Sequence, residues 1–158
     1  MIERVLIPLD GSKVGEAALV AIEERMTRWS PELKVEITLL GVVTSLTHWV
    51  VVGEASAPIS YTEEELKAIK QRVTDYLNKA GETLRSRGAT VIARVSTGNA
   101  AEEILKAANE IKANLIAMST HGRSGLRRLA FGSVTDKVMR SANVPVLLVR
   151  ASASTINM

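Results

Sequence analysis

Glycine, serine and arginine gather in one stretch in the C-terminal third of the chain. Gly122 and Gly125 lie on either side of Arg123, and nine residues separate Gly122 from the pair Gly132-Ser133. Glycines let backbone N–H groups approach an anion, and a helix that begins at Ser133 adds unpaired N–H donors with a partial positive charge. Arginine supplies charge-assisted contacts to the same anion. A phosphate chain suits this stretch, although two ordinary turns on a solvated basic face fit the spacing equally well.

Asp10 is a second candidate, because it follows a short apolar run and precedes Gly11-Ser12. A carboxylate at this place can hold a ribose hydroxyl or a metal ion, or it can accept hydrogen bonds from the amides of its own turn, which is the commoner use of aspartate. The chain has two histidines, His48 and His121, and no cysteine, so we expect no transition-metal site. Mg²⁺ carried on bound phosphates needs only one or two carboxylates.

Several well-known signatures are absent. The first apolar run is not followed by Gly-x-Gly-x-x-Gly, and the chain has no Gly-Lys-Ser or Gly-Lys-Thr, so neither a dinucleotide fingerprint nor a P-loop is present. A nucleophile elbow is also excluded around Ser124, because Leu126 stands where that motif requires glycine.

Composition excludes further classes. The chain has 158 residues, a formal net charge of +3, five aromatic residues and no cysteine. This length buries a core without disulfides, and so small a charge with so few stacking side chains gives no reason to expect nucleic acid as a partner. No apolar run reaches the length of a membrane span and no signal-peptide core is visible, so we expect no membrane association and a cytoplasmic location.

Strand and helix patterns alternate along the chain. The apolar runs predict strands at 5–9, 35–43, 90–95, 115–118 and 144–149, and helical periodicity predicts helices that end near 26, 88, 111 and 142. Ser12, Thr62 and Asn99 are the expected N-caps of the first three helices; Thr62 precedes an acidic first turn, and Asn99 has the spacing of a capping box. The order predicts an α/β fold with a single open parallel five-stranded sheet and helices on both faces.

Ligands of such sheets bind beyond the carboxyl ends of the strands, which is where Asp10 and the glycine stretch follow their strands. Residues 44–61 have no clean period and are expected to form a long loop or partly ordered flap. The uncharged run Val146–Val149 is expected at a sheet edge, where such a strand is usually paired or covered. We expect one domain over 1–150 and a short polar tail over 151–158.

Three segments together resemble the universal stress protein family: Val5-Leu6-Ile7-Pro8-Leu9-Asp10-Gly11-Ser12, Ser119-Thr120-His121-Gly122 with Gly132-Ser133-Val134, and Asn143-Val144-Pro145-Val146-Leu147-Leu148-Val149. The resemblance covers nearly the whole chain. Its nucleotide-binding branch carries a glycine, two residues, a second glycine, nine residues, and then Gly-Ser or Gly-Thr.

The resemblance implies strand order 3-2-1-4-5, a Rossmann-like fold similar to that of adenine nucleotide alpha hydrolases, ATP with Mg²⁺ or Mn²⁺ on its phosphates, and a homodimer paired through the last strand, Val146 to Val149. The roles it implies are a ribose contact by Asp10, adenine walls from Pro8 and Val42, Met118 beneath the nucleotide, and a phosphate cradle from Gly122, Gly132, Ser133 and Val134.

Ser119 departs from this pattern, because the family motif has glycine at that position. If the position needs a positive φ or very close phosphate approach, serine weakens binding; if it needs only a small residue, the hydroxyl adds a donor. Neither the motif nor the family supplies a catalytic base or a lysine for phosphoryl transfer. We therefore expect a binding protein or nucleotide-dependent switch with no catalytic residue and at most slow ATP hydrolysis.

Two other functions remain open. An adenylating enzyme of the same superfamily would need a Ser-Gly-Gly-type loop after the first strand, which Asp10-Gly11-Ser12 does not supply. A nucleotide-independent interaction module would meet an unknown protein partner through its dimer surface or through residues 44–61, where Trp49 stands.

Overall fold

A five-stranded parallel sheet forms the centre of the molecule in the computed structural model, which describes residues 1–121 and 131–151. Its strands lie in the spatial order β5-β2-β1-β6-β7, and all four neighbouring pairs are parallel. Their bounds are β1 Ile2–Pro8, β2 Lys34–Val43, β5 Thr90–Thr97, β6 Leu115–His121 and β7 Val146–Ala151. Counted by chain order within this sheet, the sequence 3-2-1-4-5 is confirmed.

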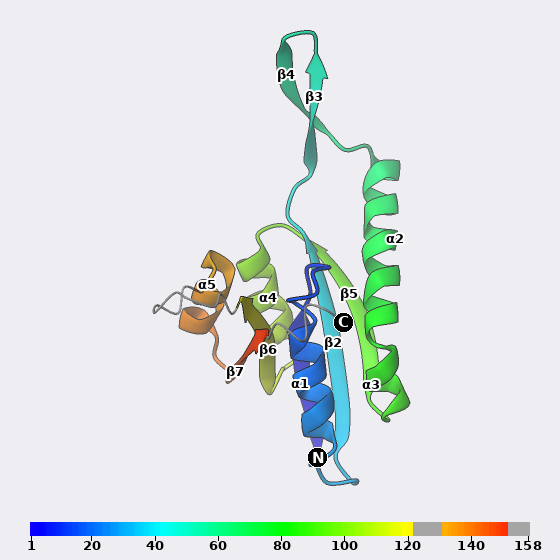
Figure 1. Cartoon of the computed structure of the whole chain (residues 1–158), viewed down its shortest axis with the longest axis vertical. Helices are drawn as coiled ribbons and strands as arrows, with labels where there is room; N and C mark the ends of the chain where they lie inside the picture. The colour runs from blue at the N-terminus through cyan, green and yellow to red at the C-terminus, as the bar shows by residue number, and fades with distance from the viewer. Residues whose placement is uncertain (122–130, 152–158) are drawn as a thin grey trace.

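Helices cover both faces of the sheet (Figure 1). One face carries α1 (Ala17–Met26), α2 (Glu63–Ala80) and α3 (Glu82–Ser86), and the other carries α4 (Ala100–Glu110) and α5 (Ser133–Ser141). A hydrophobic core lies on each face of the sheet, and successive residues of β1 point into one or the other. Ile7 belongs to the core that contains Ile22 of α1, whereas Leu6 belongs to the core that contains Ile104 of α4. A strand that is buried on both faces has a continuous apolar sequence, and this is why residues 5–9 predicted the central strand β1.

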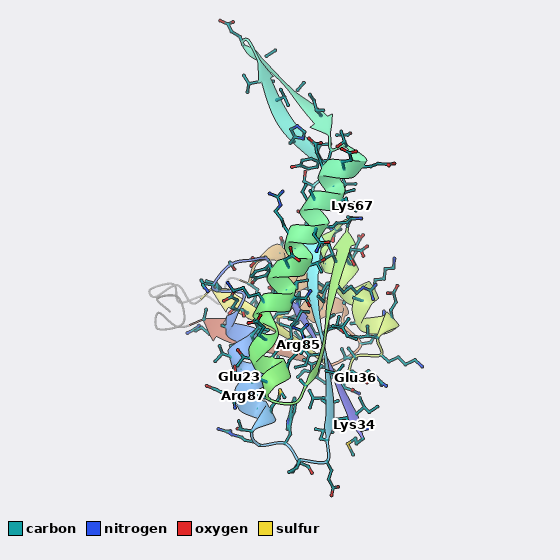
Figure 2. All side chains as sticks on the ribbon, turned by 90° about the vertical axis from the view of Figure 1, so that its right-hand side faces the viewer. Glu23, Lys34, Glu36, Lys67, Arg85 and Arg87 are labelled. Carbon is teal, nitrogen blue, oxygen red and sulfur yellow. The ribbon has the colours of Figure 1, made fainter. Side chains whose placement is uncertain are left out.

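The helix predicted to end at Gly88 is two helices. It breaks at Gly81, where an added Cβ would lie 2.8 Å from Cγ1 of Val91 on β5, so the chain approaches the sheet closely there. Beyond α3, Arg87 reaches back to α1 and pairs with Glu23 at 2.6 Å, as the neighbouring labels in Figure 2 show.

Residues 44–61 do not form the loop or flap that the sequence predicted. They contain an antiparallel hairpin, β3 (Thr47–Val52) and β4 (Ala55–Ser60), joined by Gly53-Glu54 with Gly53 at φ +64°. Glycine at a two-residue turn with positive φ is a standard hairpin signal. The strands show no apolar–polar alternation because the hairpin stands away from the body (Figures 1 and 2), and all six residues of β4 are exposed.

Candidate functional site

A cavity of about 390 Å³ opens at the carboxyl ends of β1, β2 and β6, between the sheet and the first turns of α4 and α5. In this sheet β1 lies between β2 and β6, so the chain order reverses beside it. Such a reversal is the usual ligand position of doubly wound sheets. The cavity is lined by Pro8, Leu9, Asp10, Gly15, Leu40, Val42, Thr44, Ala100, Ile104, Met118, Ser119, Val134 and Thr135.

The cavity lining is mostly apolar, with a few polar side chains. Aliphatic and thioether side chains make up most of it, and Leu9, Leu40 and Ile104 are buried in the core. Among the lining residues that the structure describes, one carboxylate, that of Asp10, and three hydroxyls provide polar side-chain groups. An apolar slot with few polar groups fits a flat heteroaromatic ring attached to a polar moiety.

Asp10 begins a tight turn and holds it closed. Its Oδ1 accepts hydrogen bonds from the Ser12 amide at 2.9 Å and from Ser12 Oγ at 2.6 Å, while Gly11 adopts φ +83°. Ser12 Oγ in turn accepts a bond from the Gly15 amide at 3.0 Å. The turn-stabilising use of the carboxylate is confirmed, and the same exposed carboxylate lines the cavity.

Ser12 does not cap α1, so that part of the prediction was wrong. The helix begins at Ala17, and in the described ranges 1–121 and 131–151 its N-cap residue Glu16 makes no side-chain cap bond. The Ala18 amide instead donates to Ser119 Oγ at 2.8 Å, and the Ser119 hydroxyl donates to the Gly15 carbonyl at 2.8 Å. A residue 101 positions away on β6 therefore caps α1.

The caps predicted for the other helices are confirmed. Thr62 accepts from the Glu65 amide and Glu65 reciprocates, a complete capping box at α2. Asn99 accepts from the Glu102 amide at 3.1 Å and orients α4, whose first residue, Ala100, lines the cavity.

A second set of contacts holds the turn after β1, on the face of the sheet that α1 and α2 cover. Tyr76 of α2 donates its hydroxyl to Oε1 of Glu16 at 3.1 Å, and Lys13 pairs with Oε2 of the same carboxylate at 3.2 Å. Burial, followed by the negative charge of Glu16, raises the pKa of Tyr76. The phenol thus remains a neutral donor to Glu16 throughout the physiological pH range.

The structure describes part of the predicted phosphate cradle. Val134 lines the cavity at the start of α5, and buried Thr135 lies beside it. Gly132 and Ser133 are exposed at the N-terminus of that helix and do not belong to the described lining. Gly122, Arg123 and Gly125 lie outside the described residues.

Six of the predicted site residues thus meet at one cavity: Pro8, Asp10, Val42, Met118, Ser119 and Val134. Seven lining residues were not among the predicted site residues: Leu9, Gly15, Leu40, Thr44, Ala100, Ile104 and Thr135. The signal for Ala100 and Ile104 was the Asn99 cap, which marks the start of α4 directly after the carboxyl end of β5. Gly15 carries no local signal, because its importance arises from contact with Asp10 in space.

A family model described as "Universal stress protein family" matches residues 1–150. This chain belongs to the universal stress protein family. This universal stress protein is 29% identical to YxiE of Bacillus subtilis over 95% of its own length and 100% of that protein. It is 31% identical to MJ0531 of Methanocaldococcus jannaschii over 94% of this chain and 82% of that one.

Solved structures of the family share the fold. MJ0577 of M. jannaschii superposes with a TM-score of 0.68 at 24% identity, covering 95% of this universal stress protein and 96% of that chain. An Arabidopsis thaliana family protein with AMP bound gives 0.65 at 18% identity, covering 96% and 94%. A further universal stress protein, in complex with cAMP, gives 0.57 at 21% identity, covering 95% and 98%.

Neither a metal cluster nor a membrane span is found in the part of the chain that the structure describes. No group of three or more histidine, aspartate or glutamate side chains is placed there to hold a metal ion. None of the helices in those ranges combines the length and apolar character needed to cross a bilayer.

Proposed function

We propose that this universal stress protein binds ATP in the cavity beside β1 and acts in the stress response as a nucleotide-binding protein or nucleotide-dependent switch. The observation that carries the proposal is the cavity itself: apolar walls and the Asp10 carboxylate meet where the strand order reverses. The AMP and cAMP in the related structures support an adenine nucleotide as the ligand.

Each part of the nucleotide has a matching set of groups. Pro8 and Val42 flank the adenine ring above Met118, and the Asp10 carboxylate accepts hydrogen bonds from the ribose. The phosphates lie toward the start of α5, where the helix offers unpaired N–H groups. The proposed cradle there consists of Gly122, Arg123, Gly125, Gly132, Ser133 and Val134.

Mg²⁺ or Mn²⁺ enters this proposal as a companion of the phosphates. Of the cavity-lining side chains in the described ranges, only that of Asp10 is a carboxylate, which is too few for a protein cage around a hard cation. A site of this kind fits an ion held mainly by phosphate oxygens and water. That ion would neutralise phosphate charge in the bound nucleotide.

Calorimetric titration of the purified protein with ATP and, separately, GTP in the presence of Mg²⁺ tests the proposal. We expect saturable ATP binding with a Kd well below about 1 mM, equivalent to more than about 4 kcal/mol, and weaker GTP binding. Absence of ATP binding at millimolar concentration would contradict it. We expect at most slow release of phosphate from ATP. Release of pyrophosphate would favour an adenylating enzyme instead.

We also propose a homodimer that pairs through β7, with residues 1–150 as the nucleotide-binding domain and the cytoplasm as its location. β7 lies at the edge of the sheet, and Val146 to Val149 are half-buried and uncharged. Exposed edges of this kind are usually paired. Sedimentation should give twice the 17.1 kDa of one chain, and a monomer would count against pairing.

A nucleotide-independent interaction role is a second candidate, favoured by the hairpin. Val51 is 72% exposed and Ile59 is 47% exposed on strands that project from the body (Figure 1). Exposed apolar side chains on a two-stranded sheet suit contact with another protein. Retained partner capture by a variant that no longer binds ATP would separate this role from the nucleotide site.

A further inference from the structure

We infer that Ser119 is a positioning residue for the ribose, and that it acts by capping α1 and thereby fixing Asp10 over the cavity. The inference rests on the proposed nucleotide function and goes further, because it assigns the nucleotide's 2′- or 3′-hydroxyl as the group whose recognition depends on Ser119. It also gives the serine at the motif's glycine position a function of its own.

The cap is complete and partly buried. The Ser119 hydroxyl donates its single proton to the Gly15 carbonyl and accepts from the Ala18 amide, both at 2.8 Å. Ala18 is fully buried, so its amide would lose its partner in a dry environment if the hydroxyl were removed. The N-cap residue Glu16 offers no replacement among the described contacts, because its carboxylate binds Tyr76 and Lys13.

Gly15 connects this cap to Asp10. Its amide donates to Ser12 Oγ, which donates to Asp10 Oδ1, while its carbonyl accepts from Ser119. A Cβ on Gly15 would lie only 2.9 Å from Asp10 Oδ1, so the carboxylate packs directly against this backbone. Displacement of Gly15 therefore displaces the carboxylate.

The same geometry decides between the two hypotheses for Ser119, that serine weakens nucleotide binding or that its hydroxyl adds a donor to the ligand. The residue lies in β6, and Lys112 is the non-glycine residue at positive φ in the described chain, so Ser119 is not strained by its side chain. Its proton is directed at Gly15, which leaves it unable to donate to a phosphate at the same time. The hydroxyl thus acts on the ligand through Asp10.

The test measures Kd for ATP, 2′-deoxy-ATP and 3′-deoxy-ATP in wild type, Ser119→Ala, Ser119→Gly and Ser119→Thr. Wild type should prefer ATP over at least one deoxy analogue by about tenfold, the size of a hydrogen bond to a charged group. Ser119→Ala and Ser119→Gly should reduce that preference to about twofold or less. Ser119→Thr, which keeps the hydroxyl, should restore it.

Thr62→Ala is the matched control, because it removes an equally complete N-cap from α2, whose first residues are not part of the cavity lining. It should lower stability while leaving the ATP preference unchanged. If Ser119 were merely structural, its variants would behave as Thr62→Ala does, with lower stability and an unchanged preference for ATP over the deoxy analogues. Tighter ATP binding by Ser119→Gly, the family's own residue, would likewise overturn the inference.

Hydrogen exchange measures the cap without any nucleotide. The Ala18 amide should exchange at least about tenfold faster in Ser119→Ala than in wild type, and at the wild-type rate in Thr62→Ala. Unchanged exchange at Ala18 would overturn the inference. If wild type binds none of the three nucleotides, the proposed function fails and the ribose assignment fails with it; if all bind but the preference survives in Ser119→Ala, only the inference fails.

Discussion

The turn after β1 and the hairpin after β2 leave neighbouring strands at the same edge of the sheet, yet they are held very differently. The turn is fixed from outside itself, by Ser119 of β6 and by Tyr76 of α2. The strands of the hairpin pair with each other and with no other strand in the described chain. At its base, Tyr61 packs against His48 with ring centroids 4.8 Å apart.

This difference separates a place suited to ligand recognition from a place suited to movement. Recognition of a small molecule needs groups held in fixed positions by their surroundings. Segments with few tertiary partners belong to the part of a protein that opens at low free energy. The described side chains even leave the buried Nδ1 of His48 without a hydrogen-bond partner, so the hairpin's base is less completely bonded than the turn.

The largest effect is expected when the turn itself is crowded. In Gly15→Val the new Cβ would lie 2.9 Å from Asp10 Oδ1 and 3.3 Å from Ser12 Oγ, so the carboxylate must move. Because Gly15 also lines the cavity, the valine side chain would occupy space that the ligand needs, in addition to displacing Asp10. We expect ATP affinity to fall about hundredfold while circular dichroism shows the fold intact. Ser56→Val on exposed β4 is the control and should bind normally. Equal affinities in the two variants would remove the distinction between the regions.

Removal of the carboxylate should have the next largest effect. Asp10→Ala should weaken ATP binding about tenfold, because a charge-assisted hydrogen bond to the ribose is lost. Asp10→Asn, which keeps an acceptor for Ser12, should preserve the turn and lose less. Asp75→Ala changes the net charge equally on the exposed face of α2 and should leave binding unaltered; a matching loss there would point to a long-range charge effect instead.

The tether at Tyr76 predicts a smaller, pH-dependent effect. Since the pKa of Tyr76 is raised in the folded protein, its contribution to stability is complete below the ordinary tyrosine pKa of about 10 and is lost as pH rises above it. Urea unfolding at pH 8 and at successively higher pH should show wild type losing more stability than Tyr76→Phe. Parallel losses in the two proteins would mean that burial and Glu16 do not raise the pKa of the phenol.

The smallest effect is expected from removal of the hairpin. Replacement of residues 47–60 by a short Gly-Ser linker should leave the ATP Kd within about twofold, because loop changes of this length cost little and none of the hairpin side chains that the structure describes belongs to the core. A tenfold loss would show that the hairpin contributes to the site. Thr44 is kept in this variant, since it lines the cavity.

Much of the fold was predictable because its causes are local. The run Val5–Leu9 is apolar on both faces since β1 is central, and the capping box at Thr62 and the side-chain cap at Asn99 each lie within four residues of sequence. The cap of α1 was not predictable, because its donor and acceptor are brought together by the β1–β6 pairing. The hairpin was missed for a different reason: β4 is exposed throughout, and the segment lacks the apolar–polar alternation that marks a half-buried strand.

Half of the site followed the same rule. Strand-end residues such as Pro8, Asp10 and Val42 were predictable, because parallel strands present their carboxyl ends at one edge. The Asn99 cap marks where α4 begins, but which of its side chains line the cavity, here Ala100 and Ile104, depends on how the helix packs against the sheet.

A crystal structure of the protein grown with ATP and Mg²⁺ tests the central claim most directly. We predict density for the adenine between Pro8 and Val42, with a ribose hydroxyl within hydrogen-bond distance of the Asp10 carboxylate and the phosphates at the N-terminus of α5. An empty cavity at saturating ATP, or a nucleotide bound elsewhere on the molecule, would contradict it.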